Sequence, residues 1–261
     1  WVTRISVSHT GNRTTVNLSQ IEWFTLNHFA ANYIELIPEA PKDLVPKFFG
    51  KTAETYDHIA FWTTFGKDRL WKNKIINQIT GCDSILDLGC GTGILTRMIA
   101  DKFPNSKIIG VDVSASYLEV AKRNSSRYQN IKYVHQDAEQ LSLVEKFDCI
   151  VSSYIPKYCD AKNLVGVCIK HLKQQGKIVL HDFTYPKNKA VSSLWQSYFT
   201  LLRCVGIFMP SWYDAFVGLP KLIKSSTWLS DYGREMRDNG LDVREQSFTW
   251  NTSAMIVGSA N

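Results

Sequence analysis

Three carboxylates lie within or just beyond three short apolar runs in the first half of the chain. Asp87 lies inside the first run, Asp112 ends the second, and Asp137 follows the third. Parallel strands bring their carboxyl ends to one edge of a sheet, where open α/β folds bind their ligands. If these runs are parallel strands, the three carboxylates converge on one crevice that suits a nucleoside.

Glycines follow the first of these carboxylates. The stretch from Asp87 to Gly93 reads Asp-Leu-Gly-Cys-Gly-Thr-Gly, and this G-x-G-x-G spacing differs from the G-x-G-x-x-G of dinucleotide enzymes. Glycines let a ligand approach the backbone without a Cβ in the way, and the helix start behind them offers free N–H groups. Asp87 suits the ammonium group of an adenosine that carries an amino acid. A strand-to-helix turn without a ligand is the alternative for this stretch taken alone.

The other two carboxylates fit the rest of such a ligand. Asp112 lies where an acid at the end of the second strand accepts both ribose hydroxyls, and a helix N-cap is the alternative. Asp137 can accept from the adenine amino group while the next backbone N–H bonds the ring. A solvated turn is the alternative at that position.

Periodicity places these residues in an alternation of strands and helices. The pattern predicts an α/β fold with a Rossmann-like sheet of seven strands, an antiparallel last strand and helices on both faces. The expected strands are 84–88, 107–112, 131–135, 147–153, 176–183, 241–248 and 252–259, and the expected helices include 93–103, 115–126, 160–173 and 227–239.

Two segments stand outside this alternation. Residues 1–45 are expected to be an extension of unknown role, with a hairpin near its start, a helix over 20–37 and an exposed Pro-rich link over 38–46. Residues 186–224 are rich in aromatic and basic side chains. They predict either a lid over an apolar pocket or two ordinary covering helices, within one domain over 46–261.

The composition narrows the class of protein. Hydrophobic residues make up 44% and charged residues 21%, which is typical of a soluble globular chain. The net charge is +6 without a long basic run, so we expect no nucleic-acid partner, and contact with an anionic membrane surface stays open. No C-x-x-C or ligand-spaced histidine pair occurs, so we expect no metal site and reduced cysteines in a cytoplasmic protein. The sequence does not indicate an oligomeric state.

The glycine stretch resembles motif I of the class I S-adenosylmethionine (SAM) methyltransferases. Tyr56-Asp57 with Phe65-Gly66 and Leu70-Trp71-Lys72, and 170–177 with Asp182-Phe183-Thr184, are similar to two signatures of the ubiquinone/menaquinone biosynthesis C-methyltransferases. The resemblance covers about residues 50–258 and implies SAM as cofactor and a small, aromatic, quinol-like acceptor. The cofactor contacts expected from it are Asp87, Gly89, Cys90, Gly91, Thr92, Asp112, Val113, Asp137, Ala138 and Ser153.

The chain departs from that family on the side where the acceptor should bind. The departures are Thr64 and Asp68 for the usual Ser and His, Gln174-Gln175 for Pro-Gly, Asp182 for Glu, and 154–158 for a Gly-Leu-Arg-Asn run. O-, N- or S-methylation of another small metabolite is therefore an alternative, as is a SAM-fold protein that binds a partner without activity. RNA methylation is disfavoured because no Asn-Pro-Pro-Tyr-type motif follows the strand 147–153.

Methylation at a carbon of a phenolic ring requires a base, or a hydrogen bond that favours the phenolate. Candidates near the expected strand ends are His181, Asp182 and Tyr154, although a histidine or an acid inside a strand can equally be structural. The side chains expected to contact the acceptor are Tyr154, Tyr185, Trp195 and Trp212.

Overall fold

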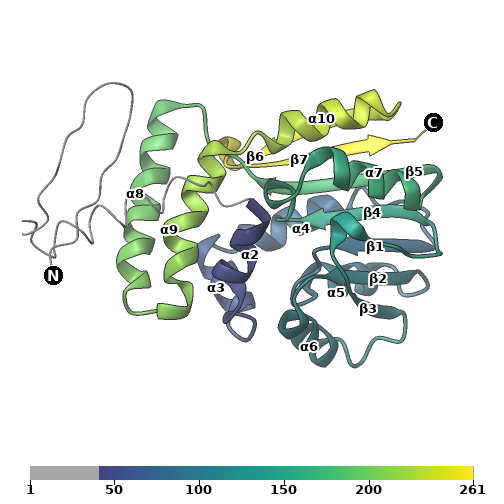
Figure 1. Ribbon diagram of the computed structural model, residues 1–261, viewed down its shortest axis with the longest axis horizontal. Coiled ribbons are helices and arrows are strands. Elements are labelled where there is room, and N and C mark those ends of the chain that lie inside the picture. The colour runs from purple at the N-terminus through teal and green to yellow at the C-terminus, as the bar shows by residue number, and fades with distance from the viewer. Residues whose placement is uncertain (1–40, 261) are drawn as a thin grey trace, which may run out of the picture. The chain divides into compact units, whose positions relative to one another are not determined.

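The computed structural model describes residues 41–260, so the hairpin and the helix expected before residue 38 lie outside the described residues. Seven strands form one sheet in the order β3-β2-β1-β4-β5-β7-β6 (Figure 1). Strands β1 to β5 pair in parallel, and β7 runs antiparallel to both β5 and β6. The predicted Rossmann-like sheet with an antiparallel last strand is confirmed. Its strands are β1 Ser84–Leu88, β2 Lys107–Asp112, β3 Ile131–His135, β4 Phe147–Ser153, β5 Leu172–Phe183, β6 Asp242–Phe248 and β7 Ser253–Ser259.

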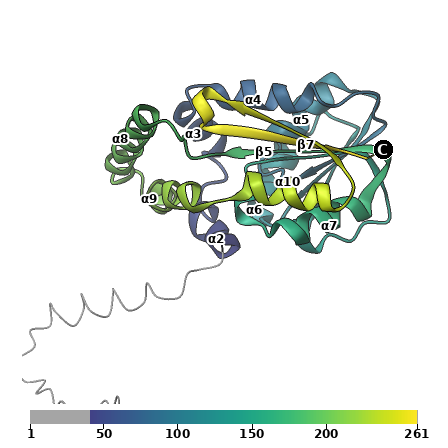
Figure 2. The same ribbon diagram turned by 90° about the horizontal axis from the view of Figure 1, so that it is seen from above.

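Helices cover both faces of this sheet. Figure 2 shows α4 and α5 on one face and α7 and α10 on the other. Four helices begin and end within two residues of the predicted positions: α5 Ile94–Lys102, α6 Ala115–Asn124, α7 Ala161–His171 and α10 Trp228–Asp238. Helix α4 spans Lys67–Ile76, ahead of β1.

Strand β5 is longer than the sequence pattern predicts. It begins at Leu172 instead of residue 176, because Leu172 already pairs with Phe147 of β4 before a shift in register. The helix expected over 160–173 therefore ends at His171, whose ring bonds the carbonyl of Val167 in its own last turn.

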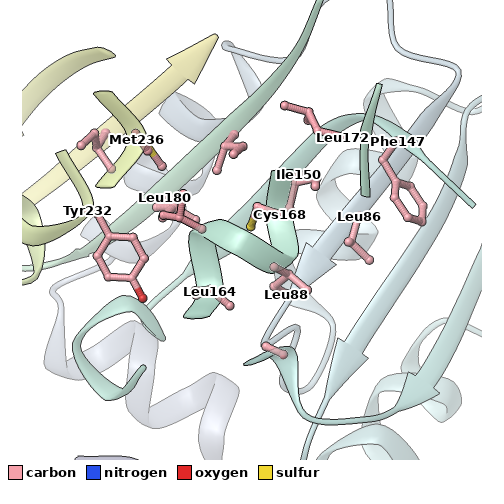
Figure 3. Packing of buried hydrophobic residues seen from close by; sticks show 14 of the residues in the cluster. Leu86, Leu88, Phe147, Ile150, Leu164, Cys168, Leu172, Leu180, Tyr232 and Met236 are labelled. Carbon is pink, nitrogen blue, oxygen red and sulfur yellow. The ribbon is translucent and has the colours of Figure 1, made fainter. Parts of the chain in front are cut away.

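The strands of the central sheet are apolar because both of their faces are covered. Figure 3 shows the packing between one face of the sheet and the helices α7 and α10. The fully or almost fully buried side chains there include Leu86, Leu88, Ile150, Leu164, Cys168, Leu180, Tyr232 and Met236. A close-packed core of this kind has low compressibility, and it fixes the carboxyl ends of the strands relative to one another.

The Pro-rich stretch expected as an exposed link is partly folded. From Pro41 it forms the short helices η2 (Pro41–Asp43) and α2 (Leu44–Phe49). Phe48 of α2 is buried among aromatic side chains of α9, and this packing orders the chain ahead of the predicted boundary at residue 46. Helix α3 (Tyr56–Thr63) follows and leads into α4.

The insertion after β5 forms two helices, α8 (Lys189–Gly206) and α9 (Pro210–Ser225). Both views show the pair beyond the end of β5, with α8 outermost (Figures 1 and 2). Within residues 41–260, no helix is long and apolar enough to span a membrane.

Candidate active site

The register of the sheet brings the predicted residues to one edge. Leu88 at the end of β1 lies opposite Val111 of β2 and Ser152 of β4. Asp112 lies opposite His135, and Ser153 lies opposite His181. The loops that leave β1, β2, β3, β4 and β5 therefore start side by side.

The glycine loop has a backbone that favours glycine. Gly89 and Gly91 have φ values of +66° and +56°, and Gly93, with φ of +78°, caps the start of α5. A Cβ on Gly89 would lie 2.2 Å from Cγ2 of Ile155, which follows β4. The loop thus needs glycine both for its conformation and for close contact with the neighbouring loop.

Asp112 closes the glycine loop from the end of β2. One carboxylate oxygen accepts the Gly91 N–H at 2.8 Å, and the other accepts the Ser114 N–H at 2.8 Å. Burial raises the pKa of this carboxyl, and the backbone hydrogen bonds oppose that shift. Each oxygen keeps acceptor capacity, because a carboxylate has about four lone-pair sites. The neighbouring Val113 is half exposed.

Asp137 is held by its own turn and by a lysine from outside the predicted domain. Its side chain accepts the Glu139 N–H at 3.0 Å and caps the short helix η3 (Ala138–Gln140). The Lys42 ammonium bonds both Asp137 and Glu139. The sequence analysis missed Lys42, because it lies within the stretch 1–45 that carries no recognisable motif.

The remaining predicted contacts on this side are partly buried in the fold. Asp87 faces α5, where it accepts the Thr96 hydroxyl at 2.6 Å, and burial raises its pKa to about 7. The Cys90 N–H bonds the carbonyl of Val111 at 3.0 Å. Thr92 donates its hydroxyl to Asp57, and Ala138 is buried.

Tyr154, directly after β4, has a strained backbone. Its φ is +77°, a conformation that costs about 1–3 kcal/mol for a residue other than glycine. Its N–H bonds the His181 carbonyl at 2.8 Å, and its own carbonyl accepts the Lys157 ammonium at 2.6 Å. Its ring stacks on Phe183 with 4.8 Å between centroids. Such strain persists where the surroundings over-determine it, and it gathers at functional sites.

The Tyr154 hydroxyl bonds Asp68, which forms a buried ion pair with Lys72 in α4. It donates to Oδ1 of Asp68 at 2.8 Å, and the Lys72 ammonium bonds the same oxygen. Asp68 and Lys72 are 5% and 4% exposed. The sequence offered one signal for this pair: Asp68 stands where the resembling family has His.

The other two catalytic candidates have their polar atoms occupied. The His181 ring lies 3.2 Å from the Ser153 hydroxyl and 2.6 Å from the Ser253 hydroxyl, one at each nitrogen. Burial, with the charges of Lys72 and Lys157, lowers its pKa well below the usual range, so the ring is neutral. Asp182 accepts the Lys157 ammonium at 2.8 Å and two backbone N–H groups.

The predicted acceptor-binding side chains fall into two groups. Trp212 is buried, stacks on Tyr56 and donates its indole N–H to Thr55 at 2.9 Å. Tyr185 and Trp195 instead contact each other edge to face at 5.2 Å, at the start of the insertion. The prediction that they join Tyr154 at one pocket stays a prediction.

Comparison with known proteins agrees with this geometry. A family model described as a methyltransferase domain matches residues 85–176, from β1 into β5. The demethylmenaquinone methyltransferase of Thermotoga maritima is 23% identical over 81% of this chain and 94% of its own length. The ubiquinone/menaquinone biosynthesis C-methyltransferase UbiE of Pectobacterium atrosepticum is 28% identical over 76% and 83%. The magnesium protoporphyrin IX methyltransferase of Synechocystis PCC 6803 shares the fold, with a TM-score of 0.59 at 16% identity, covering 84% of this chain and all of that one.

The chain carries a methyltransferase domain and is a SAM-dependent methyltransferase. This result sets aside the alternative of a partner-binding protein without activity. The donor set of the methyltransferase also fits SAM: glycines with positive φ, a carboxylate with spare acceptor sites at the end of β2, and a second carboxylate after β3.

The methyltransferase also has a cavity beside this site. It measures about 590 Å³ and lies between the residues after β4 and the starts of α7 and α10, where Lys42, Glu139, Tyr158 and Tyr232 line it. No residue of the glycine loop contributes to its wall. Within residues 41–260, no group of three or more His, Cys, Asp or Glu side chains could hold a metal ion.

Proposed function

We propose that the glycine loop, Asp112 and the turn at Asp137 bind SAM. Asp112 carries this proposal, since its carboxylate is oriented by two backbone N–H groups and keeps acceptor sites for the two ribose hydroxyls. Asp137 and Ala138 lie beyond β3, where the adenine ring would rest. Bound SAM supplies an electrophilic methyl group on a positively charged sulfur.

The proposed acceptor is a small, aromatic, quinol-like molecule. Support comes from aromatic side chains at the ends of β4 and β5, where Tyr154 stacks on Phe183. The ring centroid of Trp71 in α4 lies 5.8 Å from that of Phe183 and 5.6 Å from that of His181. Apolar and aromatic walls with few polar groups are typical of small-molecule sites. The names of the two relatives above point to the same class of acceptor.

The protein contributes mainly by position. Holding acceptor and methyl group in line can supply about 7–11 kcal/mol of the barrier. Excluding water strengthens every electrostatic contact at the reacting atoms. Hydrogen bonds to His181 and Lys157 hold the backbone of Tyr154 in place. A ring held in this way can both orient the acceptor and exclude water.

A SAM-consumption screen across quinols, phenols, amines and thiols tests the acceptor. We expect turnover with reduced quinols or phenols, and none with their O-methyl ethers, which have no ionisable hydroxyl. Turnover confined to amines or thiols would contradict the proposed acceptor and leave SAM binding untouched.

We propose in addition that the face made by α8 and the turn after α3 rests on an anionic membrane surface. Leu201 and Phe208 are 61% and 86% exposed, and Trp62 of α3 is 70% exposed. Tyr198 joins the two elements, since its hydroxyl bonds the Thr63 carbonyl at 2.5 Å and its ring lies 5.6 Å from Phe65.

The charge of this face is one-sided. No acidic residue occurs between Asp182 and Asp214, whereas Lys187, Lys189 and Arg203 are exposed there. Apolar side chains with basic neighbours are the combination that binds anionic lipid surfaces.

Flotation with vesicles checks this membrane contact. We expect the chain to float with vesicles of phosphatidylcholine and phosphatidylglycerol, and less at high salt or with phosphatidylcholine alone. Leu201→Glu should abolish flotation. The matched control is Val144→Glu, a fully exposed site before β4. Flotation by Leu201→Glu equal to that of the wild type would overturn the contact. Light scattering that shows a dimer of the wild type and a monomer of Leu201→Glu would also overturn it, because a second copy would then cover this face.

A further inference from the structure

One buried carboxylate beside the proposed acceptor site has an unused oxygen. Asp68 is 5% exposed, and both of its side-chain bonds, from Lys72 and from the Tyr154 hydroxyl, end on Oδ1. Among the residues that the structure describes, none donates to Oδ2. This oxygen is not one of the fully buried atoms that lack a partner, which leaves it accessible to a hydrogen bond from a ligand.

This carboxylate lies beside the aromatic side chains at the ends of β4 and β5. The ammonium of its partner Lys72 lies 4.6 Å from the centroid of the Tyr154 ring, directly after β4. That ring stacks on Phe183 at the end of β5. Because the Tyr154 hydroxyl bonds the same carboxylate, a group bound to Oδ2 would lie close to these aromatic side chains.

The three predicted catalytic side chains lack this feature. Both nitrogens of His181 are within hydrogen-bond distance of serine hydroxyls. Asp182 uses both oxygens, on Lys157 and on two backbone N–H groups. Tyr154 gives its hydroxyl to Asp68. Of the two carboxylates, Asp68 alone has an oxygen that receives no hydrogen bond from the residues that the structure describes.

We propose that Asp68 accepts the proton of a phenol-like hydroxyl on the methyl acceptor, while Lys72 stabilises the oxyanion that results. This inference rests on the proposed function and names the group that recognises the acceptor. The Tyr154 hydroxyl already shows that a phenol can donate to this carboxylate, at 2.8 Å. Asp68 stands where the resembling family usually has His. The carboxylate at this position is therefore a departure of this chain from that family.

In the proposed step the O–H bond of the acceptor breaks, its proton moves to Oδ2, and Asp68 becomes a neutral acid. An electron pair of the resulting oxyanion, at oxygen or at a ring carbon, forms the bond to the methyl carbon. The bond between that carbon and sulfur breaks, and its electron pair stays on sulfur. After attack by carbon, a proton shift from that carbon to oxygen restores the ring.

Binding of two probes tests the proposal without turnover. We expect calorimetry in saturating S-adenosylhomocysteine to show that the wild type binds 4-nitrophenol about tenfold or more tightly than 4-nitroanisole, which lacks the hydroxyl. Asp68→Asn should reduce that preference to about twofold or less.

Two further variants keep the test decisive. Asp68→Asn leaves Lys72 buried without a counter-charge, so Asp68→Asn/Lys72→Met removes both charges and should lose the same preference. Tyr232→Phe, which deletes a buried hydroxyl without a partner among the described residues, should keep the full preference.

Three results would overturn the proposal: no binding of 4-nitrophenol by the wild type, equal binding of both probes, or an unchanged preference in the double variant. SAM affinity is measured in parallel. If the wild type binds SAM normally but shows no preference for the hydroxyl, only the proposed role of Asp68 is rejected. If the wild type does not bind SAM, the proposed function itself is rejected.

Discussion

The two sides of the site are built in different ways. On the donor side, at the ends of β1 to β3, most of the bonds of the two carboxylates go to backbone N–H groups: Asp112 holds Gly91 and Ser114, and Asp137 holds Glu139. The ion pair of Asp137 with Lys42 is the exception among these contacts. On the acceptor side, side chains bond one another across long separations in the chain. Tyr154 reaches Asp68, and His181 reaches Ser253.

This difference has consequences for stability and for recognition. A carboxylate bound to backbone depends on a loop conformation, which nearby glycines provide. A network of buried side chains depends on every member, because an unpaired charge in a low-dielectric interior is costly. We therefore expect substitutions on the acceptor side to unfold the protein more readily than those on the donor side.

The largest effect is expected at Lys157. Lys157→Met leaves Asp182 buried without its counter-charge, which should lower the free energy of unfolding by about 3–5 kcal/mol in urea titrations. The matched control is Lys173→Met, which breaks a partly exposed pair with Asp148 and should cost about 0–1 kcal/mol. Equal losses in the two variants would contradict the view of the acceptor side as a network.

The next effect is a pH dependence that arises at Asp87. Its pKa of about 7 lies well above the ordinary value for an aspartate, so the folded state holds the proton more tightly and loses stability as pH rises from about 4 to 7. Asp87→Asn cannot ionise and still accepts from Thr96. Relative to the wild type, we expect the variant to gain about 4 kcal/mol of unfolding free energy between pH 4 and pH 8. A difference that stays constant with pH would refute this assignment.

A smaller effect separates two glycines that both have positive φ. Gly81→Ala meets no atom within 4 Å and should cost only the backbone strain, whereas Gly89→Ala places a Cβ against Ile155. We expect Gly89→Ala to be more destabilising by about 1–3 kcal/mol in thermal or urea unfolding. Equal stability of the two variants would show that the loop after β4 moves freely away from the glycine loop.

The sequence predicted the donor side well for a physical reason. Strand β1 and the glycines after it are a local pattern, since residues close in sequence determine the turn. Asp112 ends the next strand, and the parallel pairing of β1 with β2 brings it to the glycine loop. The α/β class of the fold and the bounds of most strands followed from the alternation of strands and helices. The start of β5 was misplaced because Leu172 pairs with Phe147, a contact that its own neighbours in sequence do not encode.

The acceptor side could not be predicted in the same way. Asp68 and Lys72 look like an ordinary i, i+4 pair of a surface helix, and only the fold buries them against Tyr154. Lys42 lies in a stretch without a motif, yet its ammonium reaches Asp137. The strained φ of Tyr154 carries no sequence signal either, because it results from bonds to His181 and Lys157.

The central claim is that SAM is recognised on the donor side through Asp112, while Asp68 acts on the acceptor. The most direct measurement is calorimetric binding of SAM to the wild type, Asp112→Asn and Asp68→Asn. We expect Asp112→Asn to weaken SAM binding by about 1.5–3 kcal/mol, roughly ten- to a hundredfold, through loss of charge-assisted hydrogen bonds. Asp68→Asn should stay within about threefold of the wild type, or about 0.7 kcal/mol. An unchanged dissociation constant in Asp112→Asn, or a larger loss in Asp68→Asn, would contradict this division of the site.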